Sequence, residues 1–441
     1  MSVLQWCLVL GSSLILFFVS PIAKTTSDFF RATTKGREPG VWILTSSLVI
    51  SWIFAKSITN AANLGLKYGI IGGVAYATYY LSFLFAGIII YQLRVKGSYQ
   101  SIHHFILSKY GRTSVLLFSL LIAFRLFNEV WSNSMVIGSY FGAIGTKPYY
   151  LAILVFTLLT LAYSLKGGLK SALFTDMIQM VLFGGLLLLI LTIVLPQSSD
   201  QIGLITKGSW TLAGGLDLLL VALVQVFSYP FHDPVMTDRG FITSPYKMRR
   251  AFFMAVPIGF LSILLFSLIG VYASQKGMSG QAAVEVAQSF GVILMLAINF
   301  IMITSASSTL DSAFSSFSKL AIVDLKVGGQ TVSWGRVVMM IVAVIGIIPV
   351  FFNPEILSAT TISGTMVIGL APVFLFWNWK VGKQAFNASV ITGIAFGIWY
   401  ATGRFPGQLV FFEGDYGALL SVNILGSISC FLIYLIFKWI K

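Results

Sequence analysis

A row of hydroxyl side chains runs through the apolar segment TSASSTLDSAFSSFSKLAIVD, residues 304–324. On a helix of about 3.6 residues per turn the row covers a stripe roughly 100° wide, and its members are Ser305, Ser308, Thr309, Ser312 and Ser316. Serines also let membrane helices pack closely, but the neighbouring Asp311 is an acid of the kind that usually marks a functional site or an ion pair. Because hydroxyl and carboxylate oxygens suit a small hard cation, the segment predicts an ion site.

The segments that must position this site are hydrophobic helices. The 441-residue chain is 57% hydrophobic and 10% charged, with a mean hydropathy of +0.91. This composition predicts an integral membrane protein and excludes a soluble enzyme. About thirteen apolar segments reach the length of a membrane-spanning helix, and they cover residues 3–20, 41–64, 70–93, 114–143, 148–165, 171–195, 213–232, 250–274, 288–324, 334–352, 355–379, 384–402 and 417–439.

The net charge of +14 reflects an uneven distribution of Lys and Arg. These residues gather in alternate connections between the predicted spans, which is the positive-inside pattern of a multi-pass protein of the cytoplasmic membrane. The pattern places the N-terminus outside and the C-terminus inside, and it requires no nucleic-acid partner. The first apolar segment has no Lys or Arg before it and no convincing cleavage site, so we expect a retained span.

A single membrane domain, residues 1–441, is expected. The hydrophilic connections reach only about twenty residues, which is too short for a soluble catalytic domain. Neither HExxH nor GxSxG occurs in the chain, so we do not expect an enzyme. Cys7 and Cys430 both lie in apolar spans and offer neither a disulfide framework nor a metal-ligand spacing.

The second predicted span changes character at Lys56. From there to Gly69 it combines Asn and Ser side chains, which compete with the backbone for hydrogen bonds, with glycines that weaken a helix. We expect the helix to be interrupted here and to expose carbonyl groups, as broken helices do in transporters. Lys56 is expected to pair with an acid or to act in coupling, and Asn60 is a candidate for the same site.

Three further acids lie within spans or at their ends. Glu129 is four residues after Arg125, hence on the same helix face, and we expect these two to pair, with Lys56 as the alternative partner of Glu129. Asp176 either bridges to a nearby lysine or serves as a second cation ligand or proton carrier. The third acid is Asp233, at the end of the seventh predicted span.

His232 and Asp233 lie between Pro230 and Pro234. Both prolines lack an amide donor and disturb a regular helix. They predict a second interrupted helix, the pattern of paired half-helices in inverted repeats. His232 is either structural or a proton carrier.

Three stretches resemble the solute:sodium symporter family: SLKGGLKSALFTDMIQ at residues 164–179, PVMTDRGFITSPYKMRRA at 234–251 and SSTLDSAFSSFSKLAIVDL at 307–325. The resemblance implies an all-α membrane protein with a LeuT-like core of two inverted five-helix repeats. The core would cover residues 41–379, after one extra helix within residues 1–23 and before two trailing helices within residues 384–441. This arrangement matches the predicted number of spans.

The resemblance also implies a sodium site between the second and ninth spans. Its ligands would be the carbonyl groups of Ala55, Ile58 and Ser305 and the hydroxyls of Ser308 and Thr309. A second cation site, used by some members, would be formed by Asp176, Ser308, Asp311 and Ser312. Two acids there carry more charge than one sodium ion needs, which could equally favour a proton on one of them.

Departures from the family pattern concern the substrate and Lys56. Asp233 replaces a sugar-contacting amide and Ala62 a sugar-contacting glutamine, which argues against a sugar substrate. Asp233 would favour a solute with amine or amide donors unless Lys56 or His232 neutralises it. Since Lys56 directly follows Ala55, its ammonium could replace the sodium ion or point away from it.

These features predict a sodium-coupled symporter that imports a small polar solute across the cytoplasmic membrane by alternating access. Its partners would be the solute, sodium as the coupling ion and the lipid bilayer, with no cofactor. The alternatives are a proton-coupled or sodium-independent transporter in which Lys56 replaces the ion, and a transporter-like solute sensor. The candidate residues for substrate contact or coupling are Lys56, Asn60, Glu129, His232 and Asp233.

Overall fold

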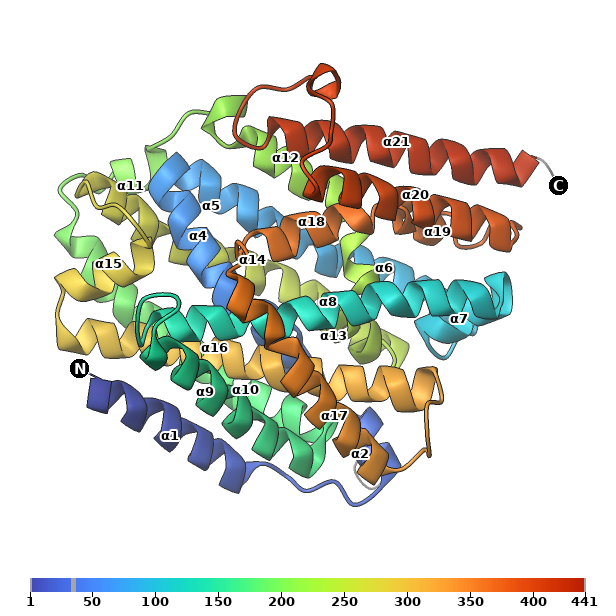
Figure 1. Cartoon of the computed structure of the whole chain (residues 1–441), viewed down its shortest axis with the longest axis horizontal. Coiled ribbons are helices and arrows are strands. Elements are labelled where there is room, and N and C mark those ends of the chain that lie inside the picture. The colour runs from blue at the N-terminus through green and yellow to red at the C-terminus, as the bar shows by residue number, and fades with distance from the viewer. Residues whose placement is uncertain (1, 33–36, 440–441) are drawn as a thin grey trace.

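The computed structural model describes residues 2–32 and 37–439, and every regular element in that part of the chain is a helix (Figure 1). The first described helix begins near one end of the long axis of the molecule, and the last described helix finishes near the other end. The predicted all-α class is confirmed for these residues.

Eight helical stretches among the described residues are long and apolar enough to cross a membrane. They are Ile70–Val95 (α5, Ile70–Ala77; η1, Thr78–Leu81; α6, Ser82–Val95), α8 (Arg112–Ser139), α9 (Lys147–Gly167), Leu169–Gln197 (mainly α10, Leu169–Val194), α14 (Pro245–Gln275), Val292–Asp324 (mainly α16, Val292–Lys319), Val332–Phe352 (mainly α17, Val332–Gly346) and α21 (Gly417–Trp439).

A further span is sharply bent. Helices α3 (Val41–Trp52) and α4 (Ala55–Tyr68) meet at 60°. The predicted interruption is confirmed, but it precedes the Asn- and Gly-rich stretch, which we expected to unwind and which forms the regular helix α4. Close packing explains why residue 65 of α4 is a glycine, because a Cβ on Gly65 would lie 2.2 Å from the Ser267 carbonyl oxygen of α14.

The predicted second interruption is also confirmed. Helix α12 (Leu216–Gln225) is followed by a 3-10 turn, Tyr229–His232, and then by the short helix α13 (Pro234–Arg239). Pro234 stands in the first turn of α13, where a missing amide costs least. Asp233 caps this helix, since its Oδ1 accepts a hydrogen bond from the Val235 amide at 2.9 Å.

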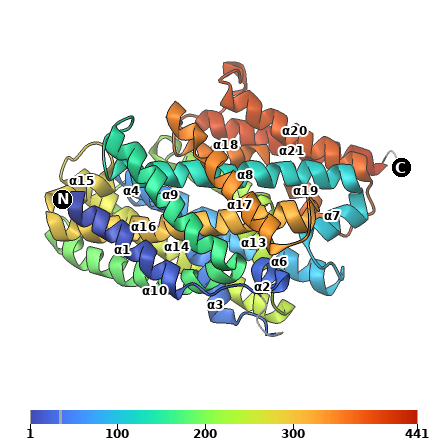
Figure 2. The same ribbon diagram turned by 60° about the horizontal axis from the view of Figure 1, so that its bottom comes forward.

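The other predicted spans are shorter or broken helices, so the number thirteen stays a prediction. They are α1 (Ser2–Val19), α18 (Ser358–Met366) with α19 (Leu370–Leu375), and α20 (Lys383–Ala401), while the connections hold α2 (Thr26–Arg31), α7 (Ile102–Tyr110), α11 (Gly203–Thr206) and α15 (Ala282–Ser289). Helix α1 lies along α9 at one edge, and α20 and α21 lie side by side at the opposite edge (Figures 1 and 2). The division into a core at 41–379 with flanking helices remains a prediction.

The two interruptions meet in the interior of the molecule. Helix α16, which carries the hydroxyl row, contacts α3, α4, α8 and α13, and α8 also contacts α4 and the turn before α13. Chain breaks, hydroxyl groups and buried charges are therefore gathered in one region.

Candidate functional site

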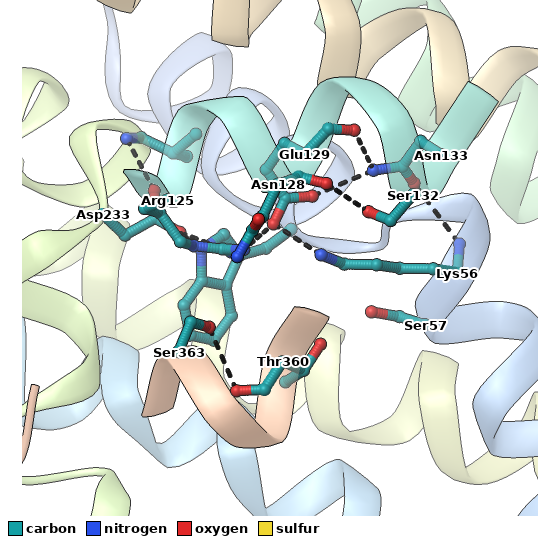
Figure 3. Close-up of polar contacts among 12 residues, drawn as sticks. Lys56, Ser57, Arg125, Asn128, Glu129, Ser132, Asn133, Asp233, Thr360 and Ser363 are labelled. Carbon is teal, nitrogen blue, oxygen red and sulfur yellow. Dashed lines mark hydrogen bonds and ion pairs between the residues drawn. The ribbon is translucent and has the colours of Figure 1, made fainter. Parts of the chain in front are cut away.

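Four charged side chains form one buried group, here named the four-charge cluster: Lys56, Arg125, Glu129 and Asp233 (Figure 3). Lys56 Nζ lies 2.6 Å from Glu129 Oε1, and Arg125 Nη2 lies 2.9 Å from Asp233 Oδ2. Arg125 also pairs with Glu129, four residues along α8. No side chain of the four is more than 5% exposed. Two positive and two negative charges thus compensate one another, as buried ions require.

Both interrupted helices contribute residues to this cluster. Lys56 stands in the first turn of α4, where its amide donates to Asn133 Oδ1 at 3.3 Å, and Asp233 caps α13. Trp52, the last residue of α3, donates from Nε1 to Asp233 Oδ2 at 2.8 Å. The expected Arg125–Glu129 pair and its alternative, Lys56 with Glu129, are both present.

A small chamber lies beside the cluster. Its walls are mostly aromatic and come from Trp52, Phe54, Ser57, Tyr76, Tyr79, Tyr80, Tyr229 and Thr360. The free space is about 10 Å³, roughly that of a single water molecule. The chamber therefore has no room for a molecule larger than water in this structure.

Two predicted residues, Asn60 and His232, contact tyrosines of the chamber wall. Asn60 Nδ2 donates to the Tyr76 hydroxyl at 3.3 Å. His232 Nδ1 lies 2.6 Å from the Tyr229 carbonyl oxygen and so carries a proton that it donates, while its Nε2 has no hydrogen-bond partner among the described residues. Arg125, rather than Lys56 or His232, forms the ion pair that neutralises Asp233.

A second buried group, the serine–acid cluster, joins α3, α10 and α16: Ser47, Ser51, Asp176, Ser308, Asp311, Ser312 and the α13 residue Arg239. Asp176 accepts hydrogen bonds from Ser47, Ser308 and Ser51, the last at 3.1 Å. Arg239 Nη2 lies 3.1 Å from Asp176 Oδ2. Asp176 therefore pairs with this arginine and not with a lysine.

Sequence reasoning missed Arg239. It lies in a connection between two predicted spans, where the positive-inside pattern explains an arginine, but its side chain is 0% exposed. The available signal was its distance from Asp233: six residues of helix rise only about 9 Å, which is too little to carry the arginine out of the interior.

The predicted sodium ligands lie on two helices that contact each other, α4 and α16. Ser305 Oγ donates to the Ile53 carbonyl group at the break between α3 and α4, so the hydroxyl row faces that break. Thr309 Oγ1 donates to the Ser305 carbonyl oxygen at 3.0 Å, and the Ala55 carbonyl group accepts from Thr59. Ala55 and Ile58 are fully buried in the first turn of α4. The five-oxygen site stays a prediction.

The predicted second cation site is brought together only in part. Within the serine–acid cluster, hydrogen bonds link Asp176, Ser308 and Ser312, either directly or through Arg239. Asp311 is turned toward another partner, because its Oδ2 accepts from Thr175 Oγ1 at 3.0 Å and its Oδ1 has no hydrogen-bond partner in the described chain.

No family model matches the sequence. A curated relative, the urea-proton symporter DUR3 of Oryza sativa subsp. japonica, is 22% identical over 440 residues, covering 85% of this chain and 60% of that protein. The chain thus spans about 60% of the length of this relative.

Solved structures resemble the chain over nearly its whole length. A Na⁺-coupled sialic acid symporter in a substrate-bound outward-open state matches with a TM-score of 0.74 and 16% identity, covering 99% of this chain and 98% of that one. MhsT in complex with L-phenylalanine gives 0.60 at 14% identity, covering 91% and 99%, and Mhp1, a nucleobase-cation-symport-1 family transporter, gives 0.56 at 13%, covering 94% and 96%. The expected LeuT-like fold is confirmed. The sialic acid symporter, Mhp1 and the rice relative are named as transporters, not enzymes.

Proposed function

We propose that the protein is a cation-coupled symporter that moves a small polar solute across the cytoplasmic membrane by alternating access. The observation that carries this proposal is the meeting of two interrupted helices, α3/α4 and α12/α13, with the hydroxyl row of α16 in a LeuT-like fold. Broken helices at such a point present carbonyl groups and half-helix ends to ions and substrates. The N-terminus would face outside and the C-terminus the cytoplasm.

The coupling ion in this proposal is sodium. It would bind between the first turn of α4 and α16, held by the carbonyl groups of Ala55, Ile58 and Ser305 and by the hydroxyls of Ser308 and Thr309. The Ser305 contact to the break supports this position, as does the likeness to a Na⁺-coupled symporter.

The solute would bind in the aromatic chamber beside the four-charge cluster. Because the charges of that cluster compensate one another, the site favours a neutral solute that accepts and donates hydrogen bonds. Asn60 and the Tyr76 hydroxyl offer such groups. Urea, which the name of the rice relative contains, is the first solute to test.

Proton coupling is the second candidate. The rice relative is named a proton symporter, which favours it. The alternative mechanism, in which Lys56 replaces the coupling ion, has less support, because the Lys56 ammonium donates to Glu129 in the four-charge cluster.

Two measurements test the proposal. In proteoliposomes, an inward sodium gradient should accelerate uptake of labelled urea, whereas acceleration by an inward proton gradient alone would favour the second candidate. Binding of solute without uptake under either gradient would indicate a sensor and contradict the proposal.

The sodium site is tested in detergent by the melting temperature across a sodium series, with choline holding ionic strength constant. A ligand that binds only the folded protein raises its stability, by about 2.7 kcal/mol at a hundred times Kd. The double variant Ser308→Ala/Thr309→Ala should raise the sodium concentration at half-effect at least about tenfold, since two ligands are lost. Ser316→Ala, in the same row, is the matched control and should respond like the wild type. An unchanged sodium response in the double variant would refute the site.

A further inference from the structure

Arg239 is a fully buried arginine whose guanidinium lies among oxygen atoms from three helices. Its Nε donates to Ser47 Oγ at 2.6 Å, and its Nη2 lies 2.9 Å from Ser312 Oγ, 3.1 Å from Asp176 Oδ2 and 3.2 Å from Ser51 Oγ. Nη1 has no hydrogen-bond partner among the described residues. The arginine is thus the centre of the serine–acid cluster.

The same oxygen atoms would suit a free cation. One carboxylate and several hydroxyls form the ligand set of a hard monovalent ion. A cation held by Asp176, Ser51 and Ser312 would lie beside the guanidinium, since all three contact Nη2. Two like charges about 4 Å apart at an effective dielectric constant near 20 repel strongly enough to weaken binding about a thousandfold. Arginine and a free ion therefore exclude each other here.

We propose that Arg239 is a tethered cation that permanently occupies the second cation site in place of a mobile ion. The guanidinium cannot lose its charge in a protein and cannot diffuse away. At most one external cation would then bind in each transport cycle, and Arg239 determines that number. The statement on cycles rests on the proposed symport function, whereas occupation of the site can be measured by binding alone.

The test uses the full chain in detergent and compares three variants across a sodium series against choline. Arg239→Gln removes the charge and should gain a second saturable rise in melting temperature with sodium, which the wild type lacks. Arg239→Lys keeps a positive charge and should gain none. Arg336→Gln is the matched control, because Arg336 donates to the Leu165 carbonyl group instead of an acid, and it should respond as the wild type does.

The origin of the new response is checked by adding Asp176→Asn to Arg239→Gln, which should abolish it. Equal sodium responses of wild type, Arg239→Gln and Arg239→Lys would overturn the proposal. If Arg239→Gln stays folded only when purified in sodium, the proposal is supported, and loss of the fold in both salts would overturn it. The two sites share Ser308, whose hydroxyl donates to Asp176, so they are separated through Thr309, which belongs to the α4–α16 site alone. The new response of Arg239→Gln should persist when Thr309→Ala is added.

Discussion

The four-charge cluster and the serine–acid cluster are both buried and both receive a charge from α13, yet their charges add up differently. In the first, Lys56 and Arg125 compensate Glu129 and Asp233. In the second, Arg239 pairs with Asp176, whereas Asp311 forms no ion pair among the described residues. Because an uncompensated buried charge is costly, Asp311 needs one external positive charge, a proton or a cation, to become neutral. Under the proposed function, the balanced cluster would serve packing and solute recognition, and the unpaired acid of the second cluster would affect the response to the coupling cation.

Helix α13 connects the two clusters physically. Asp233 caps its start and pairs with Arg125, and Arg239 ends it and pairs with Asp176. A rigid shift of this short helix would disturb both ion pairs together. Under the proposed function, this gives solute and cation a shared element through which each changes the affinity for the other by the same factor.

The largest effect is expected from Arg125→Gln, which breaks the balanced cluster. It leaves Asp233 without its ion-pair partner and Glu129 with Lys56 alone, so the free energy of unfolding should fall by about 3–5 kcal/mol. Thermal or denaturant unfolding measures this loss. The charge-balanced double variant Arg125→Gln/Glu129→Gln is the control and should recover part of the stability. A loss below about 1 kcal/mol in the single variant would show that the cluster is solvated.

Lys56→Met should have an intermediate effect. Glu129 keeps its contact with Arg125 but loses one charged hydrogen bond, which corresponds to about 1–3 kcal/mol. The sodium dependence of the melting temperature should match that of the wild type, because the ammonium belongs to the balanced cluster. A gain of sodium dependence would instead place Lys56 in the ion site.

Asp311→Asn should change stability least. The free energy of unfolding should fall by at most about 1 kcal/mol, or rise, because the substitution removes the uncompensated charge and leaves Asp176 paired with Arg239. It should nevertheless weaken the response to the coupling cation. Asp238→Asn is the matched control, since Asp238 is also buried but pairs with Lys319 at 2.6 Å, and it should cost more stability. A larger loss of stability in Asp311→Asn than in Asp238→Asn would show that Asp311 is not the unpaired acid.

The hydroxyl row and the two interruptions could be predicted from the sequence because they depend on local periodicity and on residues with special backbone behaviour. All five hydroxyl residues are buried on α16, and both breaks occur. The position of the first break was predicted too late along the chain. Asn and Gly weaken a helix locally, but the packing of Gly65 against α14 compensates for this, and that packing is a tertiary contact.

Which charge pairs with which was decided only by the tertiary structure. Spacing on one helix was enough to anticipate Arg125 with Glu129, since both lie on α8. The partners of Lys56, Asp233 and Arg239 come from helices far away in sequence, and Coulomb attraction acts through space without regard to chain separation. By itself the sequence determined a polar, ion-compatible interior within an all-helical membrane protein. Only the fold placed Arg239 at Asp176, because the short helix after the second break holds it inside the protein, where an ionised arginine needs an acid beside it.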